Sequence, residues 1–177
     1  MVVFSNHGVF DGQKAAPYVE SDEAARVWPL EARALGEKRA LIIRTSTLID
    51  QLDDGGVIAR MATSLVRGEP VEAASDVLFA PSAASDVSRV ALDLLIDEAW
   101  GVWHLINGSP LTWRALAEQL ASTLNADHSL IYPAAGAKQG ITLSSEQGWL
   151  MPSLTPLIER FAEAAMTLQQ RWSSRAS

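Results

Sequence analysis

The sequence contains no cysteine, which excludes disulfide bonds, thiolate zinc sites and a cysteine nucleophile. It also has no run of lysine and arginine, and its net charge is -7. Nucleic acids and anionic membranes both bind clustered basic residues, so neither is an expected partner. The longest apolar stretches, such as Ala91–Ile96, are far shorter than the roughly 20 residues of a membrane span. Because the first residues also lack the pattern of a secretory signal, we expect a cytoplasmic protein.

Several ligand-binding motifs are missing as well. None of the eleven glycines forms the G-x-G-x-x-G pattern that lets backbone approach a dinucleotide, and no Walker-type phosphate loop is present. His7, His104 and His128 each lack a second ligand at helical spacing, so we predict no metal site. The acidic pairs Asp22–Glu23 and Asp53–Asp54 are interpreted as helix-dipole partners or a solvated face.

What the chain does have is the composition of a globular protein. Its 177 residues are 48% hydrophobic and 20% charged, which is enough apolar material for one buried core. We therefore predict a single domain over residues 1–177.

Short apolar runs alternate with segments of helical periodicity. The runs Val2–Phe4, Ala40–Thr45 and Gly101–Ile106 are typical of parallel strands buried on both faces, and Pro70–Phe79 is expected to be extended. The expected helices are Glu20–Glu37 with a break at Pro29, Val57–Val66, a segment after Ser85–Asp86, Trp113–Leu124 and Pro152–Trp172. Asp86 is expected to cap its helix, and Ser109 or Thr112 the helix at Trp113. This order of elements predicts an α/β fold with a parallel sheet.

Polar residues follow two of the expected strands, and open parallel sheets bind ligands at the carboxyl ends of their strands. We therefore predict that a ligand site would be lined by Asn6, His7, Arg44, Ser46 and Thr47. Arg44 is the residue best suited to an anionic phosphate. His7 has the alternative interpretation of a hydrogen-bonding turn residue.

Other conspicuous residues have structural interpretations. Asp11–Gly12 is first a turn signal. His104 lies in an apolar strand and is expected to be a hydrogen-bonded core histidine. Trp103, Trp113 and Trp149 occupy positions that favour packing over carbohydrate binding.

Four segments, taken together, resemble the dTDP-4-dehydrorhamnose reductase family of the extended short-chain dehydrogenases. They are FSNHGVFDG from Phe4, PYVESD from Pro17, LIIRTS from Leu41 and GVWHLINGSPLTWRALAEQL from Gly101, and the resemblance continues to SSEQGWLMPSL at 144–154. It covers only the later part of the family fold. The resemblance implies a partial Rossmann-like parallel sheet made of the last strands, a small mixed substrate-binding lobe and a C-terminal helix. The strands that carry the cofactor's glycine loop have no counterpart.

The resemblance also implies a function, because the family reduces the 4-keto group of a nucleotide-linked deoxysugar with NADPH. Its proton donor is a tyrosine with a lysine four residues later. Here Tyr18 and Tyr132 are followed at that distance by Asp22 and Gly136, and the helix that would carry the pair is expected to be shortened. We therefore expect no catalytic residues and no cofactor bound by this chain alone.

The family's orienting hydroxyl and the acid after it are replaced by Asn6 and His7, and its common aromatic by Thr47. Our first hypothesis is a degenerate or truncated reductase-like protein that binds a sugar nucleotide. The alternative is a non-catalytic module for protein interaction or regulation on the same scaffold. A hydrolase using Ser, His and Asp ranks last, because no nucleophile-elbow pattern is present.

The first strand raises the question of assembly. If Val2–Phe4 is an edge, its unpaired backbone and apolar faces are a template for another chain. Covering by the C-terminal helix is one solution, and a cofactor-binding partner domain is another. We predict a homo-oligomer, most simply a two-fold dimer, through residues 1–5 or the helix near Val27–Leu35.

Overall fold

A computed structural model describes residues 1–50, 56–134, 140–148 and 150–176 of the chain. The acidic pair at 53–54 and Trp149 lie outside the described residues. The chain clusters into two compact units. Unit 1 comprises Met1–Leu48, Leu78–Pro110 and Gln139–Pro152, and unit 2 comprises Ile49–Val77, Leu111–Lys138 and Ser153–Ser177. The assignment of the whole chain to one domain stays a prediction.

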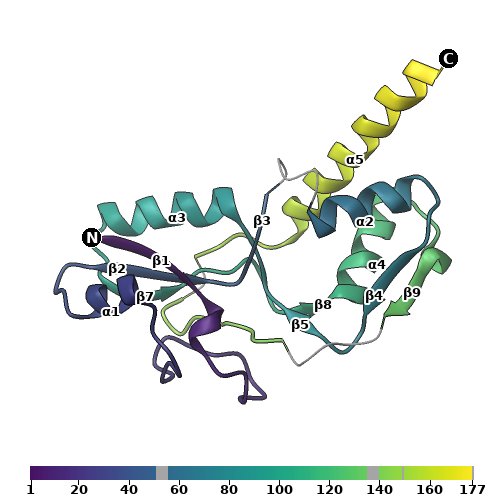
Figure 1. The fold of residues 1–177 in the computed structure, drawn as a ribbon. Helices are drawn as coiled ribbons and strands as arrows, with labels where there is room; N and C mark the ends of the chain where they lie inside the picture. The colour runs from purple at the N-terminus through teal and green to yellow at the C-terminus, as the bar shows by residue number, and fades with distance from the viewer. Residues whose placement is uncertain (51–55, 135–139, 149, 177) are drawn as a thin grey trace. The chain divides into compact units, whose positions relative to one another are not determined.

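Unit 1 holds the larger sheet and two α-helices (Figure 1). Its elements are β1 (Val2–Asn6), the 3-10 turn η1 (His7–Val9), α1 (Pro29–Leu35), β2 (Leu41–Thr45), the start of β3 (Thr47–Ile49), β5 (Leu78–Phe79), β6 (Pro81–Ala83), α3 (Ala84–Ile96) and β7 (Gly101–His104).

The sheet has the order β1-β2-β7, and all three strands are parallel. On one face Val3 and Ile42 pack against Ala34 of α1, and on the other Leu41 and Ile43 pack against α3. The predicted α/β class with a parallel sheet is confirmed. Since β1 and β2 end in register, Asn6 lies beside Thr45 and both polar segments leave the same edge of the sheet.

The long helix expected over Glu20–Glu37 is wrong in its first half, because α1 begins only at Pro29. Proline suits a first helical position, where its missing N–H leaves no bond unmade. Before it, carboxylates bind loop groups instead: Asp22 accepts hydrogen bonds from the Val19 N–H and from Lys14 Nζ. The resulting α1 has seven residues, and the shortening expected for this helix is confirmed.

The expected cap of α3 is also wrong. The helix begins at Ala84, and Asp86 lies inside its first turn. A residue from the loop after β7 does the capping, because Asn107 Oδ1 accepts the Ala83 N–H at 2.8 Å and Asn107 Nδ2 donates to Asp86 at 2.9 Å. This buried asparagine joins the start of α3 to the sheet.

Unit 2 is mostly helical. Its elements are α2 (Val57–Val66), β4 (Val71–Ala74), β8 (Leu111–Thr112), α4 (Trp113–Leu124), the 3-10 turn η2 (His128–Leu130), β9 (Ile131–Ala134) and α5 (Thr155–Ala176). Strands β4 and β9 pair in parallel. Of the two candidate caps of α4, Thr112 is the one used, since its Oγ1 accepts the Ala115 N–H at 3.1 Å. Among the described residues, no helix has the length and apolarity needed to cross a bilayer.

Candidate functional site

The polar end of β1 is a tight turn built by Asn6 and Gly8. Asn6 Oδ1 accepts the Gly8 N–H at 2.8 Å and so caps η1. A Cβ at Gly8 would lie 2.7 Å from that oxygen, so a larger residue here would make the Asn6 side chain shift away from its capping position. The turn leaves the half-buried imidazole of His7 directly beyond the strand end.

His7 lies against the end of β2. Burial lowers its pKa, and a hydrogen bond with the Thr45 backbone opposes this shift without cancelling it. The ring is therefore mostly neutral at pH 7, and its Nδ1 is buried without a hydrogen-bond partner among the described residues. A neutral imidazole with an unused nitrogen is able to bind a hydroxyl or carbonyl group.

Two hydroxyl groups at the end of β2 also lack hydrogen-bond partners. Thr45 and Ser46 are buried, and neither Thr45 Oγ1 nor Ser46 Oγ has a partner in the described part of the chain. Thr47, the next residue, is half-buried in β3. Buried polar atoms are almost always hydrogen-bonded in proteins, so a group of them without partners indicates a place for a ligand or water.

Arg44 is held in a different way. Its Nε and Nη2 donate to Glu31 Oε1 at 2.9 and 2.7 Å, while Ser5 Oγ donates to Glu31 Oε2. Arg44 is 4% exposed and Glu31 is 0% exposed. The guanidinium also lies over the ring of Phe10, 5.3 Å from its centroid. This network links α1 to the ends of β1 and β2. Arg44, the residue expected to bind a phosphate, is already paired with Glu31 in it. Contact of Arg44 with a ligand stays a prediction.

Sequence reasoning missed Glu31. A signal was available, because Glu31 stands three residues before the buried Ala34 on a short helix, and Arg44 stands inside an apolar strand. Opposite charges on the buried faces of a helix and a strand indicate an ion pair, since a buried charge is stable only when it is compensated.

His104 anchors the third strand end. Its Nδ1 lies 2.9 Å from the Ser144 carbonyl and 3.2 Å from that of Tyr18, so Nδ1 carries the proton. The expected core histidine is thus hydrogen-bonded through one nitrogen, while the buried Nε2 has no partner among the described residues. Burial lowers the pKa of His104, with Glu20 the largest opposing influence.

Glu20 closes the same region. It accepts the His104 N–H at 2.8 Å, the Ser145 hydroxyl at 2.7 Å and the Glu146 N–H at 2.9 Å. Burial raises the pKa of Glu20, but these hydrogen bonds outweigh it and the pKa lies below the usual value. The segment around Glu20 is therefore fixed to residues about 125 positions away.

The tyrosine nearest this region has a structural role. The Tyr18 hydroxyl donates to Asp11 Oδ1 at 2.6 Å and accepts the Lys14 N–H at 3.0 Å. Its bond is the main cause of the lowered pKa of Asp11. Asp11 also accepts the Gln13 N–H, and Gly12 has φ of 75°, so the predicted turn at Asp11–Gly12 is confirmed.

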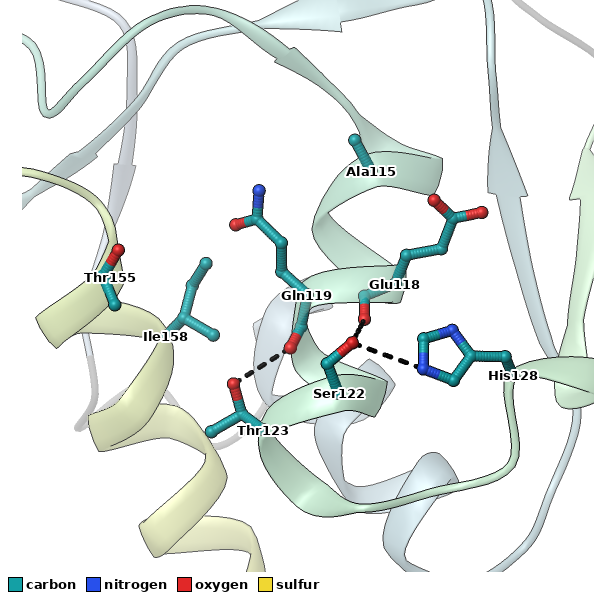
Figure 2. A pocket seen from close by; sticks show the side chains of 8 residues that line it. All are labelled: Ala115, Glu118, Gln119, Ser122, Thr123, His128, Thr155 and Ile158. Carbon is teal, nitrogen blue, oxygen red and sulfur yellow. Dashed lines mark hydrogen bonds between the residues drawn. The ribbon is translucent and has the colours of Figure 1, made fainter.

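A second polar region is a groove of about 580 Å³ in unit 2, lined by α4, η2 and the start of α5 (Figure 2). Here the two hydroxyls on α4 have partners: Ser122 and Thr123 each donate at 2.9 Å to the carbonyl four residues earlier. His128 Nε2 lies 3.3 Å from Ser122 Oγ. Because the serine proton is already donated, the imidazole must be the donor, which is the wrong direction for activating a nucleophile.

No group of three acidic or histidine side chains able to hold a metal ion occurs among the described residues. In the described part of the chain, no loop after a strand carries the three spaced glycines of a dinucleotide-binding turn.

Comparison with known proteins gives the family. A curated relative, the probable low-salt glycan biosynthesis reductase Agl14 of Haloferax volcanii, is 29% identical over 140 residues, which are 72% of this chain and 47% of that protein. The dTDP-4-dehydrorhamnose reductase of Bacillus anthracis, solved in complex with NADP, has a TM-score of 0.70 at 20% identity and covers 90% of this chain and 63% of its own. MoeE5, solved in complex with UDP-glucose and NAD, has a TM-score of 0.67 at 21% identity, with 99% and 64% covered.

These solved structures share the fold with this chain, and the chain spans about half the length of the curated relative and less than two thirds of the solved ones. The family model described as the RmlD substrate binding domain matches residues 1–144. The chain belongs to the RmlD substrate binding domain family.

Proposed function

We propose that this chain binds a sugar nucleotide and supplies the substrate-binding part of a reductase of nucleotide-sugar metabolism. The observation that carries the proposal is the set of buried polar atoms without partners at the ends of β1 and β2, on His7, Thr45 and Ser46. The match of residues 1–144 to a substrate-binding domain family supports it. So does the presence of UDP-glucose in the complex of a protein with the same fold.

In this proposal the strand ends bind the uncharged sugar. Asn6, His7, Ser46 and Thr47 offer neutral donors and acceptors, which match hydroxyl and carbonyl groups. Arg44 is part of the proposed site because Glu31, which binds both Arg44 on β2 and Ser5 on β1, links the two strand ends. A direct contact of Arg44 with phosphate would require the guanidinium to leave Glu31.

We propose further that the chain alone does not catalyse the reduction. The sequence has no tyrosine with a lysine four residues later and no glycine loop for the cofactor. The side chains at the strand ends can bind and orient a sugar, but none is a hydride source. We expect no NADPH oxidation by the isolated chain with a 4-keto sugar nucleotide, and fluorescence titration showing micromolar NADPH binding would contradict this.

Binding is tested by calorimetric titration with UDP-glucose and dTDP-glucose, with UDP alone separating the nucleotide from the sugar. We expect Ser46→Ala to weaken sugar-nucleotide binding about fivefold, the value of one hydrogen bond of about 1 kcal/mol. Ser88→Ala is the matched control, because Ser88 is an exposed serine of unit 1 on α3. Equal affinities for UDP and UDP-glucose would show that the sugar does not contribute to binding, which would contradict the proposed site.

A non-catalytic interaction module is the second candidate. The observation that favours it is the exposed aromatic side chain of Phe4 on β1, which is 58% exposed. Failure of both sugar nucleotides to bind at millimolar concentration, with the fold intact by circular dichroism, would favour this second function.

A further inference from the structure

Asn107 is a buried residue whose side-chain amide is fully used by the fold. It is 0% exposed and lies in the loop after β7. Its Oδ1 accepts the Ala83 N–H, and its Nδ2 donates to Asp86 Oδ2 at 2.9 Å and to the Pro152 carbonyl at 3.1 Å. The backbone N–H of Asn107 also donates to the Pro81 carbonyl at 3.3 Å. One residue therefore joins β6, the start of α3 and the segment at Pro152, all within unit 1.

The residue after Asn107 makes this asparagine more reactive than the others. The sequence has three asparagines, and Asn107 is the one that precedes a glycine. The backbone nitrogen of the following residue is able to attack the asparagine Cγ, and a side chain on that residue hinders the attack. Gly108 has no Cβ, and its φ of 68° lies in the left-handed region that glycine adopts freely. The pair Asn107–Gly108 therefore combines a reactive sequence with a buried, fully bonded side chain.

We propose that Asn107 is a deamidation site that the fold protects, and that its conversion prevents the start of α3 from bonding to the loop after β7 again. This inference goes beyond the proposed sugar-nucleotide binding and does not depend on it. The Gly108 nitrogen forms a bond to Cγ of Asn107, the Cγ–Nδ2 bond breaks, and ammonia leaves with the amide proton, which gives a five-membered succinimide. Water then opens this ring to aspartate or isoaspartate.

The folded state opposes both steps. Loss of Nδ2 as ammonia requires its bonds to Asp86 and Pro152 to break, and hydrolysis requires water beside a residue that is 0% exposed. The reaction therefore proceeds from a locally opened state of unit 1, and its rate follows the population of that state.

The deamidated side chain has the wrong hydrogen-bonding groups for this place. It keeps an acceptor for the Ala83 N–H, but an oxygen replaces the NH2 donor. That oxygen would face Asp86 Oδ2 and the Pro152 carbonyl, which are both acceptors. The cation beside this pair is Arg89, whose Nη2 lies 4.0 Å from Asp86 Oδ1. Two carboxylates at hydrogen-bond distance resist joint ionisation, so the converted chain cannot restore the contact at neutral pH.

Asn107→Asp reproduces the main product and tests this consequence by urea unfolding. Relative to the natural chain at the same pH, we expect the folded-to-unfolded ratio to fall at least tenfold at pH 7.5, because a buried donor is lost and a charge is added. Like-charge contact raises the folded-state pKa of the carboxyl pair, so the loss should be smaller at pH 5, where the pair holds a proton. A loss of the same size at both pH values would overturn the proposal.

Two further variants separate the carboxylate clash from simple packing damage. Asn107→Ala removes the same hydrogen bonds without adding a charge, so it should destabilise by a similar factor at both pH values. Asn125→Asp makes the same chemical change at an exposed residue that ends α4 in unit 2, where we expect an effect of a few-fold at most. If Asn107→Asp is no less stable than Asn107→Ala at pH 7.5, the clash is absent and the proposal is wrong.

Peptide mass spectrometry of the natural chain incubated at pH 7.5 tests the modification itself. We expect Asn107 to convert at least tenfold faster in urea above the unfolding midpoint than in buffer. Asn125 is the internal control, because it is exposed in the folded chain and precedes alanine, and its conversion should stay slow in both conditions. Equal rates for Asn107 with and without urea would refute the protection, and conversion no faster than that of Asn125 in the unfolded chain would refute the site.

Discussion

The strand ends of unit 1 and the groove of unit 2 both contain hydroxyl groups, but the hydroxyls at the end of β2 and those on α4 differ in their hydrogen bonding. In the groove, Ser122 and Thr123 donate to carbonyls of their own helix. At the strand ends, Thr45 and Ser46 are buried without partners among the described residues. A hydroxyl on a helix reaches the backbone four residues earlier, whereas one at the end of a parallel strand has no such carbonyl beside it. Unmet hydrogen bonding is therefore the property that separates the strand ends from the groove.

The two regions also differ in their ion pairs, and this gives the largest expected effect. Removing one partner of a buried pair leaves an uncompensated charge, so Glu31→Ala should destabilise the protein by about 3–5 kcal/mol. In the groove, Glu118 pairs with Arg114 at 2.9 Å near the surface, and Glu118→Ala should cost about 0.3–0.5 kcal/mol. Urea unfolding measures both, and equal losses would show that the buried network is not what holds unit 1.

The two histidines of unit 1 predict a pH dependence of intermediate size. Burial lowers the folded-state pKa of His7 and of His104 below the unfolded value of 6.5. The unfolded chain then binds more protons than the folded one. The free energy of unfolding is therefore highest above about pH 6.5 and falls as the pH drops toward 5. His7→Gln should flatten this decrease. Urea series at pH 5, 6 and 7.5 check it, and a decrease as steep in the variant as in the natural chain would argue against the role of His7.

The smallest expected effect is an increase in stability, whereas the changes above decrease it. Ser46→Ala removes a buried hydroxyl that has no partner, so it should stabilise the unliganded protein by about 1 kcal/mol while weakening sugar-nucleotide binding. Ser122→Ala, in the groove, should change stability by less than about 0.5 kcal/mol, because the hydroxyl is exposed. Chemical unfolding without ligand separates the two. A loss of stability in Ser46→Ala would mean that its hydroxyl has a structural partner.

Local patterns predicted several elements well. The helix expected at Val57–Val66 is α2 with the same bounds, because glycines at 56 and 68 stand at its two ends and its apolar residues keep one period. The strands expected at Val2 and Ala40 are β1 and β2. By contrast, the final helix starts at Thr155, three residues later than expected, and extends to Ala176.

Elements held by distant contacts were predicted poorly. The stretch after Glu20 has helical composition, but Glu20 binds Ser145 and Glu146 instead. The start of α3 is capped by Asn107, which lies 24 residues after Ala83 in the sequence. Propensity and capping rules describe neighbours along the chain, so they cannot foresee a partner that only the fold brings near.

The sequence predicted where in the fold the candidate site residues lie, but only part of what each of them does. The rule that ligands lie at the carboxyl ends of parallel strands selected Asn6, His7, Ser46 and Thr47. It could not reveal that Arg44 is bound to Glu31, because those residues meet through the packing of α1 on β2. The binding role of all these residues stays a prediction until the titrations are made.

The sequence by itself determined the alternation of strands and helices and the polar composition of the strand ends, because periodicity and residue type are local properties. The tertiary structure decided which polar groups have partners. Arg44 and Glu31 neutralise each other, His104 bonds through one nitrogen, and Ser46 has no described partner. Hydrogen bonds and ion pairs require a few ångströms of proximity, and residues 13 to 125 positions apart reach it only when the chain folds.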